Sequence, residues 1–83
     1  MGSARPRPAR LAEKLLQIRQ SLGCSQRELV KLMGMEDQIH YTNISKYELD
    51  KNEPPLTILL AYSRVSNIPV ETLIDDEIQL TAD

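Results

Sequence analysis

The chain has 83 residues, of which 41% are hydrophobic and 27% charged, and its formal net charge is −2. This composition is ordinary for one small globular domain with a single core, and it excludes wholesale disorder. No apolar run approaches the roughly 20 residues of a membrane span, and the amino-terminal residues lack the apolar stretch of a secretory signal, so we expect a cytoplasmic protein.

The charge is unevenly distributed along the chain. Residues 1–31 carry a net charge of +5, whereas residues 32–83 carry −7. Such a molecule can present a positive face to a phosphate backbone and keep its negative face away from it. The alternative is a solvated imbalance without any partner, and charge alone does not decide between the two.

Pro6 and Pro8 alternate with arginines near the amino terminus, which predicts a flexible basic arm at residues 1–10. A mobile basic arm gains affinity for nucleic acid by releasing counterions. We therefore expect phosphate contacts without base specificity from Arg5, Arg7 and Arg10, the alternative being a solvated tail.

The first predicted helix follows the arm and ends at Gly23. Its apolar residues recur at spacings of four, three and four, as in an amphipathic helix: Leu11, Leu15, Ile18 and Leu22. Cys24 comes next and is expected to be a small hydrophobic residue at the helix junction. As the single cysteine it cannot form an internal disulfide, which fits a reducing cytoplasm.

The second predicted helix begins with a capping box. Ser25 can accept from the amide three residues on, while the Glu28 side chain reaches back to the Ser25 amide. Gly34 is expected to end this helix. Its buried stripe is expected to consist of Leu29, Leu32 and Met33.

Turn residues 50–55 precede a helix that is apolar on most of its circumference. Pro55 suits its first position, Asn67 ends it, and we expect it to be the most buried helix of the fold. Pro69 opens a short last helix. The side chains of this last helix that should pack inward are Val70, Leu73 and Ile74.

Residues 76–83 form an acidic tail in which Ile78 and Leu80 are candidates for a dimer contact. No segment of the chain alternates apolar and polar residues with the β-branched enrichment of a strand. The sequence therefore predicts an all-α fold, a compact bundle of four to five helices.

No set of residues predicts catalysis. His40 is the only histidine, and no cluster of His, Cys and carboxylates has the spacing of metal ligands. A glycine-rich phosphate loop is absent from the sequence. The acidic run 75–77 is more typical of a solvated face than of a metal site. We therefore expect no enzyme, no metal site and no cofactor.

Several short motifs occur in a characteristic order: GCSQRELV at 23–30, Gly34, ISKYE at 44–48, Pro54 and LLAYS at 59–63. Their order and mostly matching spacing resemble the Cro and phage-repressor-like, or XRE-type, helix-turn-helix family. The resemblance runs from about residue 11 to 74 and implies a lambda-repressor-like DNA-binding domain at 11–75. The resemblance also implies that the third of five helices reads DNA, and that the protein comes from a bacterium or phage and is associated with the nucleoid.

The resemblance implies a role for each matching residue. The third helix would contact bases or the groove, and its threonine, asparagine and lysine suit base edges; the residues are Tyr41, Thr42, Asn43 and Lys46. Phosphate contacts would come from Gln26, Lys51 and Asn52 in addition to the arm; the alternative role for Gln26 is to brace the reading helix. Ile44 would be its buried pivot, supported by Tyr47, and Arg19 would pair with Glu48.

For some of these residues a role without DNA contact is also open. Lys46 is by default a solvated lysine, and Tyr41 can serve packing instead of DNA contact. His40 is expected to be a surface or capping residue rather than a reader of bases. An ion pair between Arg19 and Glu48 contributes little if it is exposed, but breaking one side is costly if it is partly buried.

The sequence departs from the family pattern in two places. Gly34 and Ile44 are ten residues apart, whereas about six is usual. Either Asp37 caps a third helix around 38–48, or Thr42 caps it and the extra residues form a loop; Ile39 favours the first, because it could pack inward from an added turn. Asp50 stands where the family usually has glycine, and aspartate tolerates the left-handed conformation.

The sequence thus predicts a sequence-specific DNA-binding transcriptional regulator. We expect a repressor that acts as a homodimer on roughly palindromic double-stranded DNA, with no membrane partner. A second class stays open: an antitoxin or adaptor helix-turn-helix module whose main role is to bind a protein partner.

Overall fold

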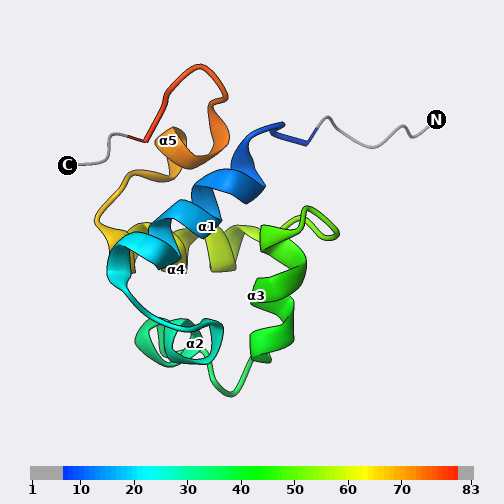
Figure 1. The fold of residues 1–83 in the computed structure, drawn as a ribbon, viewed down its shortest axis with the longest axis vertical. Coiled ribbons are helices and arrows are strands. Elements are labelled where there is room, and N and C mark those ends of the chain that lie inside the picture. Colours follow the sequence, from blue (N-terminus) through cyan, green and yellow to red (C-terminus); the bar gives the residue numbers. More distant parts are fainter. Residues whose placement is uncertain (1–6, 81–83) are drawn as a thin grey trace.

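The computed structural model describes residues 7–80, which form five α-helices and no strand (Figure 1). The prediction of an all-α bundle is confirmed. No helix in this range is long and apolar enough to cross a membrane. The helices are α1 (Leu11–Leu22), α2 (Gln26–Met33), α3 (Tyr41–Glu48), α4 (Leu56–Ser66) and α5 (Val70–Ile74).

The ends of α1 and α2 follow from local chemistry. Both helices end at a glycine in the left-handed conformation, Gly23 at φ 67° and Gly34 at φ 69°. At the start of α2 the Glu28 amide donates to Ser25 Oγ at 3.0 Å, and the Ser25 amide donates to Glu28 Oε1 at 2.8 Å. The Ser25 amide thereby holds the pKa of the Glu28 carboxyl below its ordinary value. The capping box is therefore present as the sequence predicts.

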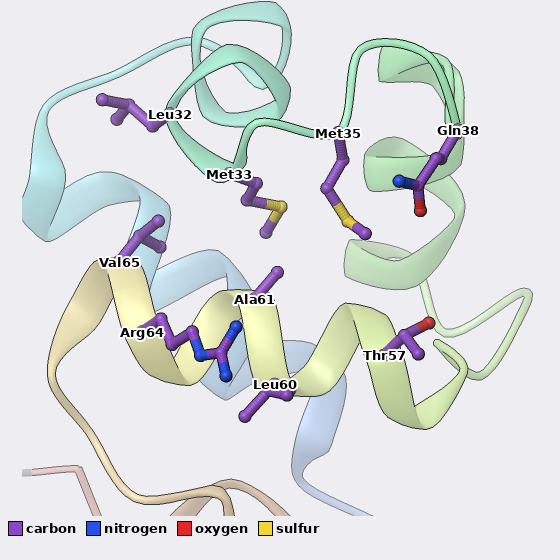
Figure 2. A pocket seen from close by; sticks show the side chains of 9 residues that line it. All are labelled: Leu32, Met33, Met35, Gln38, Thr57, Leu60, Ala61, Arg64 and Val65. Atoms are coloured by element: carbon purple, nitrogen blue, oxygen red, sulfur yellow. The ribbon is translucent and has the colours of Figure 1, made fainter.

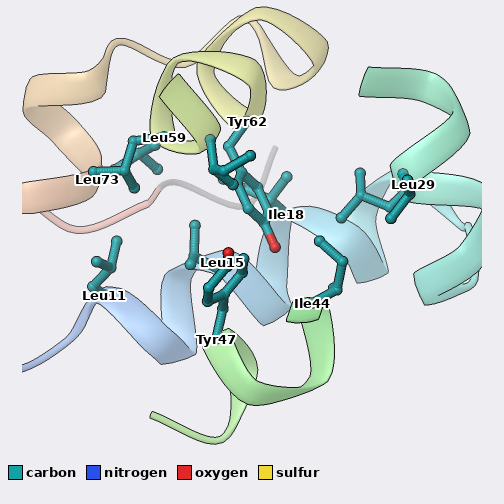
Figure 3. Close-up of a cluster of buried hydrophobic side chains, with 11 residues drawn as sticks. Leu11, Leu15, Ile18, Leu29, Ile44, Tyr47, Leu59, Tyr62 and Leu73 are labelled. Atoms are coloured by element: carbon teal, nitrogen blue, oxygen red, sulfur yellow. The ribbon is translucent and has the colours of Figure 1, made fainter. Parts of the chain in front are cut away.

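One core joins all five helices (Figure 3). Tyr62 of α4 is fully buried at its centre, and its hydroxyl has no hydrogen-bond partner among the described residues. Burial accordingly raises the pKa of that hydroxyl. The cluster consists of Leu11, Leu15, Ile18, Leu29, Val30, Ile44, Tyr47, Ile58, Leu59, Tyr62 and Leu73.

Some apolar residues that the sequence assigns to the core lie outside it. Leu32 on α2 is 57% exposed, whereas Val30 is buried with Leu29, so the buried side of this helix differs from the predicted one. On α4, Leu56 is 74% exposed and Leu60 41%, since only one side of that helix meets the others. Ile74 is also exposed. Pro55 precedes α4 as its N-cap instead of being its first residue.

Leu32 and Leu60 border an open hollow of about 380 Å³ between α2 and α4 (Figure 2). We call it the α2–α4 hollow. Its lining is mostly apolar, and Arg64 and Gln38 stand at its edge. The complete lining is Leu32, Met33, Met35, Gln38, Thr57, Leu60, Ala61, Arg64 and Val65.

The ends of α1 and α5 are capped reciprocally. The Asp76 carboxylate accepts from the amides of Ala9 and Arg10 at 2.9 and 3.0 Å, where α1 begins without a cap of its own. These amides lower the pKa of the Asp76 carboxyl. Lys14, only 1% exposed, donates to the carbonyls of Thr72 and Asp75 at 2.8 and 2.7 Å, where α5 ends.

The carboxyl-terminal segment beyond α5 thus belongs to the packed structure. Leu80 packs against the core, and Ile78 is half-buried beside it. Residues 81–83 of the predicted acidic tail lie outside the described residues. The two apolar residues that suggested a dimer contact are therefore used, at least in part, within a single chain.

The structure corrects the predicted start of the reading helix. α3 begins at Tyr41 rather than near residue 38, so the version of the helix capped by Asp37 is wrong. The amides of Gln38 and Ile39 both donate to the Met35 carbonyl, which closes a separate turn. His40 is then extended at φ −96° and ψ 154°, so the turn cannot continue into the helix.

The extra residues therefore form a loop, but neither alternative had its cap right. The cap is His40 and not Thr42. Ile39 does pack against the core, and so does Met35. Because these two residues hold the loop at both ends, Ile39 needs no helix to reach the interior.

Candidate nucleic-acid interface

α2 and α3 are joined by the 34–40 connection, and α3 also packs against α1 (Figure 1). Ile44 and Tyr47 hold its inner face, at 0% and 5% exposure. Thr42 and Lys46 are exposed on its outer face, and Asn43 is half-buried. α3 thus combines a fixed apolar side with a polar side open to solvent, which is what a helix needs to enter a major groove.

A nearly buried ion pair fixes the carboxyl end of α3. Arg19 donates to both oxygens of Glu48, through Nε at 2.6 Å and Nη2 at 3.0 Å. The side chains are 20% and 5% exposed, and these hydrogen bonds raise the pKa of the Arg19 guanidinium. Gln26 also donates to Glu48, at 3.1 Å. In the structure Gln26 therefore braces the reading helix, and its phosphate contact stays a prediction.

His40 and Thr42 interact at the amino end of α3. The Thr42 amide donates to Nδ1 of His40 at 3.4 Å, and Thr42 Oγ1 lies 3.0 Å from the same nitrogen. His40 is exposed and acts as the helix cap. The reading helix therefore starts at a defined residue despite the long connection before it.

Tyr41, the first residue of α3, lies between two other side chains. The guanidinium carbon of Arg27 is 4.4 Å from the centroid of its ring, and the His40 ring centroid is also 4.4 Å away. Tyr41 packs partly against the core as well. Tyr41 is thus half-buried, and part of its side chain remains open to solvent.

The turn after α3 is held by the amino-terminal segment. Asp50 adopts φ 60°, the left-handed conformation that the sequence suggests for it. Arg7 Nη1 donates to the Asp50 carbonyl at 2.9 Å and to its carboxylate at 3.2 Å. The amides of Lys51 and Asn52 both donate to the Lys46 carbonyl, while their side chains are exposed. This turn is therefore ordered, and its polar side chains are available to a ligand.

The basic half of the sequence does not form one free positive face. Arg7 pairs with Asp50, Arg10 with Glu13 at 3.2 Å, and Lys14 is buried. Arg5 lies outside the described residues. Within residues 7–80, the exposed cations that make no ion pair are Arg27, Lys31, Lys46, Lys51 and Arg64.

Two basic residues have roles that the sequence does not predict. Arg27 contributes only charge to the predicted pattern, but in the fold it lies against Tyr41 at the start of α3. Lys14 likewise contributes only charge to that pattern, yet it caps α5 inside the fold. In the sequence, the only indication of the role of Arg27 is that it directly follows Gln26, a residue already predicted to contact DNA or the reading helix. Lys14 gave a sign as well, because it occupies the buried side of α1 beside Leu11 and Leu15.

The side chains that could ligate a metal ion do not gather at one place in the described part of the chain. Within residues 7–80, no group of three or more His, Cys, Asp or Glu side chains could hold a metal ion. Cys24 is half-buried against the core, and burial raises the pKa of its thiol. The thiolate that would react or bind metal is accordingly disfavoured.

Comparison with known proteins agrees with this geometry. The model of the family described as Helix-turn-helix matches residues 15–73, from the middle of α1 into α5. Neither the curated proteins nor the solved structures gave a match. Members of the matching family are DNA-binding regulators and are generally not enzymes. The chain belongs to the helix-turn-helix family of the XRE and Cro type.

Proposed function

We propose that this protein is a sequence-specific transcriptional regulator, and that it represses by inserting α3 into the major groove of its operator. One observation carries the proposal. α3 is fixed by Ile44, Tyr47 and the Glu48 ion pair while Thr42 and Lys46 on the same helix stay exposed. A helix held rigidly with polar side chains facing outward fits base recognition.

The exposed side chains suit that task chemically. Lysine can donate to guanine, asparagine can pair with adenine, and a threonine methyl can contact thymine. Lys46 and Thr42 are four residues apart, so they lie on the same side of α3. Lys51 and Asn52 follow at its carboxyl end and, with the arm, supply the phosphate contacts that position α3.

Selection of bound sites from a pool of random double-stranded DNA is the direct test. The wild-type protein is expected to enrich one sequence. Lys46→Ala is then expected to weaken binding to that sequence by about 1–3 kcal/mol, because the lysine would lose its hydrogen bonds to a base edge. Binding is measured by fluorescence anisotropy at fixed salt.

Lys31→Ala is the matched control. Lys31 is another exposed, unpaired lysine, but it belongs to α2 and lines a hollow with Gly23 and Cys24 rather than with residues of α3. The control is expected to bind like the wild type. Equal losses in both variants would show that Lys46 contributes only charge, and a wild-type protein that enriches no sequence would refute the proposal.

The repressor is further proposed to bind as a homodimer. A single domain of this size offers one reading helix, whereas a dimer places two helices in successive major grooves and so recognises a palindrome. Apolar surface is available for this outside the α3 face. Leu56 and Leu60 are exposed on α4, and Leu32 is exposed across the α2–α4 hollow (Figure 2).

Sedimentation measurements with increasing protein concentration test the dimer, both free and with operator DNA. A mass of two chains on a palindromic site is expected. A single chain at high concentration and also on DNA would exclude it. The selected sites are an independent readout, because a dimer enriches two inverted half-sites a helical turn apart.

The same hollow favours a second candidate function, that of an antitoxin or adaptor module. Its lining would admit apolar side chains of another protein, and Arg64 at its edge could pair with an acidic residue there. Purification from the native source separates the candidates. A different polypeptide that copurifies in a fixed ratio, with a single copy of this chain, would support the adaptor.

A further inference from the structure

Arg27 is the second residue of α2, and it is exposed. Its guanidinium carbon lies 4.4 Å from the centroid of the Tyr41 ring. Among residues 7–80, none of its N–H groups has a hydrogen-bond or ion-pair partner. A guanidinium that rests on an aromatic ring keeps its donors free at the edge, and their planar arrangement matches the oxygens of a phosphate.

The surroundings of this pair leave the donors accessible. Arg27 and Tyr41 line an open hollow of about 200 Å³ together with Ile39, His40 and Glu36. Glu36 is exposed and forms no ion pair with Arg27. The guanidinium is therefore held in place by the ring, but its hydrogen-bonding capacity is unused.

The position of the pair relates it to the reading helix. Tyr41 is the first residue of α3, next to Thr42, and Arg27 belongs to the first turn of α2. Helix amino termini attract phosphate, because their amides and dipoles favour negative charge. A DNA strand whose bases meet the amino end of α3 would thus pass its phosphates close to Arg27.

We propose that Arg27 binds one DNA backbone phosphate, and that its contact with the Tyr41 ring couples this phosphate to the base step at the amino end of α3. The proposal rests on the proposed function and adds a contact to it. The phosphate fixes the guanidinium, the guanidinium orients the ring, and the ring edge then meets the groove. Arg27 is a phosphate ligand and also the positioning residue for Tyr41.

The salt dependence of binding tests the phosphate contact. Binding to the selected operator is measured over a range of salt concentrations for the wild type, Arg27→Ala and Arg27→Lys. Arg27→Ala is expected to lower affinity roughly tenfold and to reduce the slope of log K against log[salt] by about 0.9, the value for one phosphate. Arg27→Lys keeps the charge, and therefore the slope. Lys31→Ala, one helical turn further toward the carboxyl end of α2 and without a contact to the Tyr41 ring, is expected to change neither.

Base selection tests the coupling to Tyr41. Arg27→Lys loses the planar guanidinium over the ring and is expected to relax base preference at the outer positions of each half-site, while the central positions keep theirs. Tyr41→Phe retains the ring and should keep more of the preference at these outer positions than Tyr41→Leu does. Tyr41→Leu removes the ring and should relax the same positions as Arg27→Lys, and the double variant should add nothing further.

Thermal denaturation accompanies each variant, since an altered fold would change every position alike. An unchanged salt slope in Arg27→Ala would overturn the phosphate contact. Unchanged base preference in both Arg27→Lys and Tyr41→Leu would overturn the coupling. Either result leaves the proposed function intact if wild-type protein still enriches a sequence, whereas wild-type protein that enriches none refutes both.

Discussion

Replacing Arg19 with methionine is expected to destabilise the fold by about 3–5 kcal/mol, because it leaves a buried carboxylate without its cation. Glu48 is only 5% exposed and accepts two hydrogen bonds from Arg19. After the substitution, the Gln26 amide would be its remaining side-chain donor among the described residues. A loss of this size is a large part of the total stability of a small domain. Urea denaturation followed by circular dichroism measures it.

The double variant Arg19→Met with Glu48→Met is the informative control. Because it removes both charges, it is expected to regain much of the stability that the single variant loses. A single variant within about 0.5 kcal/mol of the wild type would mean that water screens the pair as it does at an open surface. DNA binding by the double variant would then report whether the pair also orients α3.

Replacing Lys14 with methionine is expected to cost about 2–4 kcal/mol, since two carbonyls at the end of α5 would lose a charged donor. Methionine has nearly the length of the lysine stem, so the substitution leaves no large cavity at this fully buried position. The lost contacts are those to Thr72 and Asp75 at 2.8 and 2.7 Å. Chemical denaturation gives the change in the free energy of unfolding.

Lys31→Met serves as the reference for this substitution. Lys31 is exposed and makes no ion pair within the described chain, so its replacement should change stability by no more than about 0.5 kcal/mol. Equal stability of the two variants would contradict the role assigned to Lys14. Such an outcome would mean that burial of the apolar methionine side chain compensates for the lost hydrogen bonds.

Local chemistry made most of the helix boundaries predictable. Gly23 and Gly34 end helices because they adopt positive φ, and Ser25 with Glu28 begins one through its capping box. Such signals depend only on residues close in sequence, so they can be recognised from the sequence alone. The same reasoning anticipated the left-handed Asp50.

The start of α3 was harder to predict from the sequence. Ile39 fits the apolar period of an added helical turn, but in the structure it reaches the core from a loop. His40 was expected to be a surface or capping residue, and it is the cap. Because histidine is not among the strong capping residues, this expectation did not by itself mark the start of the helix. Periodicity reports which residues are buried, and a loop residue can satisfy it as well as a helical one.

The contacts of Lys14, Asp76 and Arg27 depend on residues distant in sequence. Lys14 meets carbonyls 58 and 61 residues away, and Asp76 meets the amide of Arg10 66 residues away. The sequence shows that a residue is charged, but it does not show which helix end lies beside that residue in the fold. Only the tertiary arrangement separates a buried cap from a solvated side chain.

The reciprocal capping of α1 and α5 also bears on the order in which the chain folds. Contacts between α1, α2 and α3 close short loops, whereas the contact of Arg10 with Asp76 closes a loop of nearly the whole domain. Loop closure costs more entropy as the loop lengthens, and a helix of five residues has little stability of its own. α5 should therefore dock last, onto a helix-turn-helix unit that has already formed.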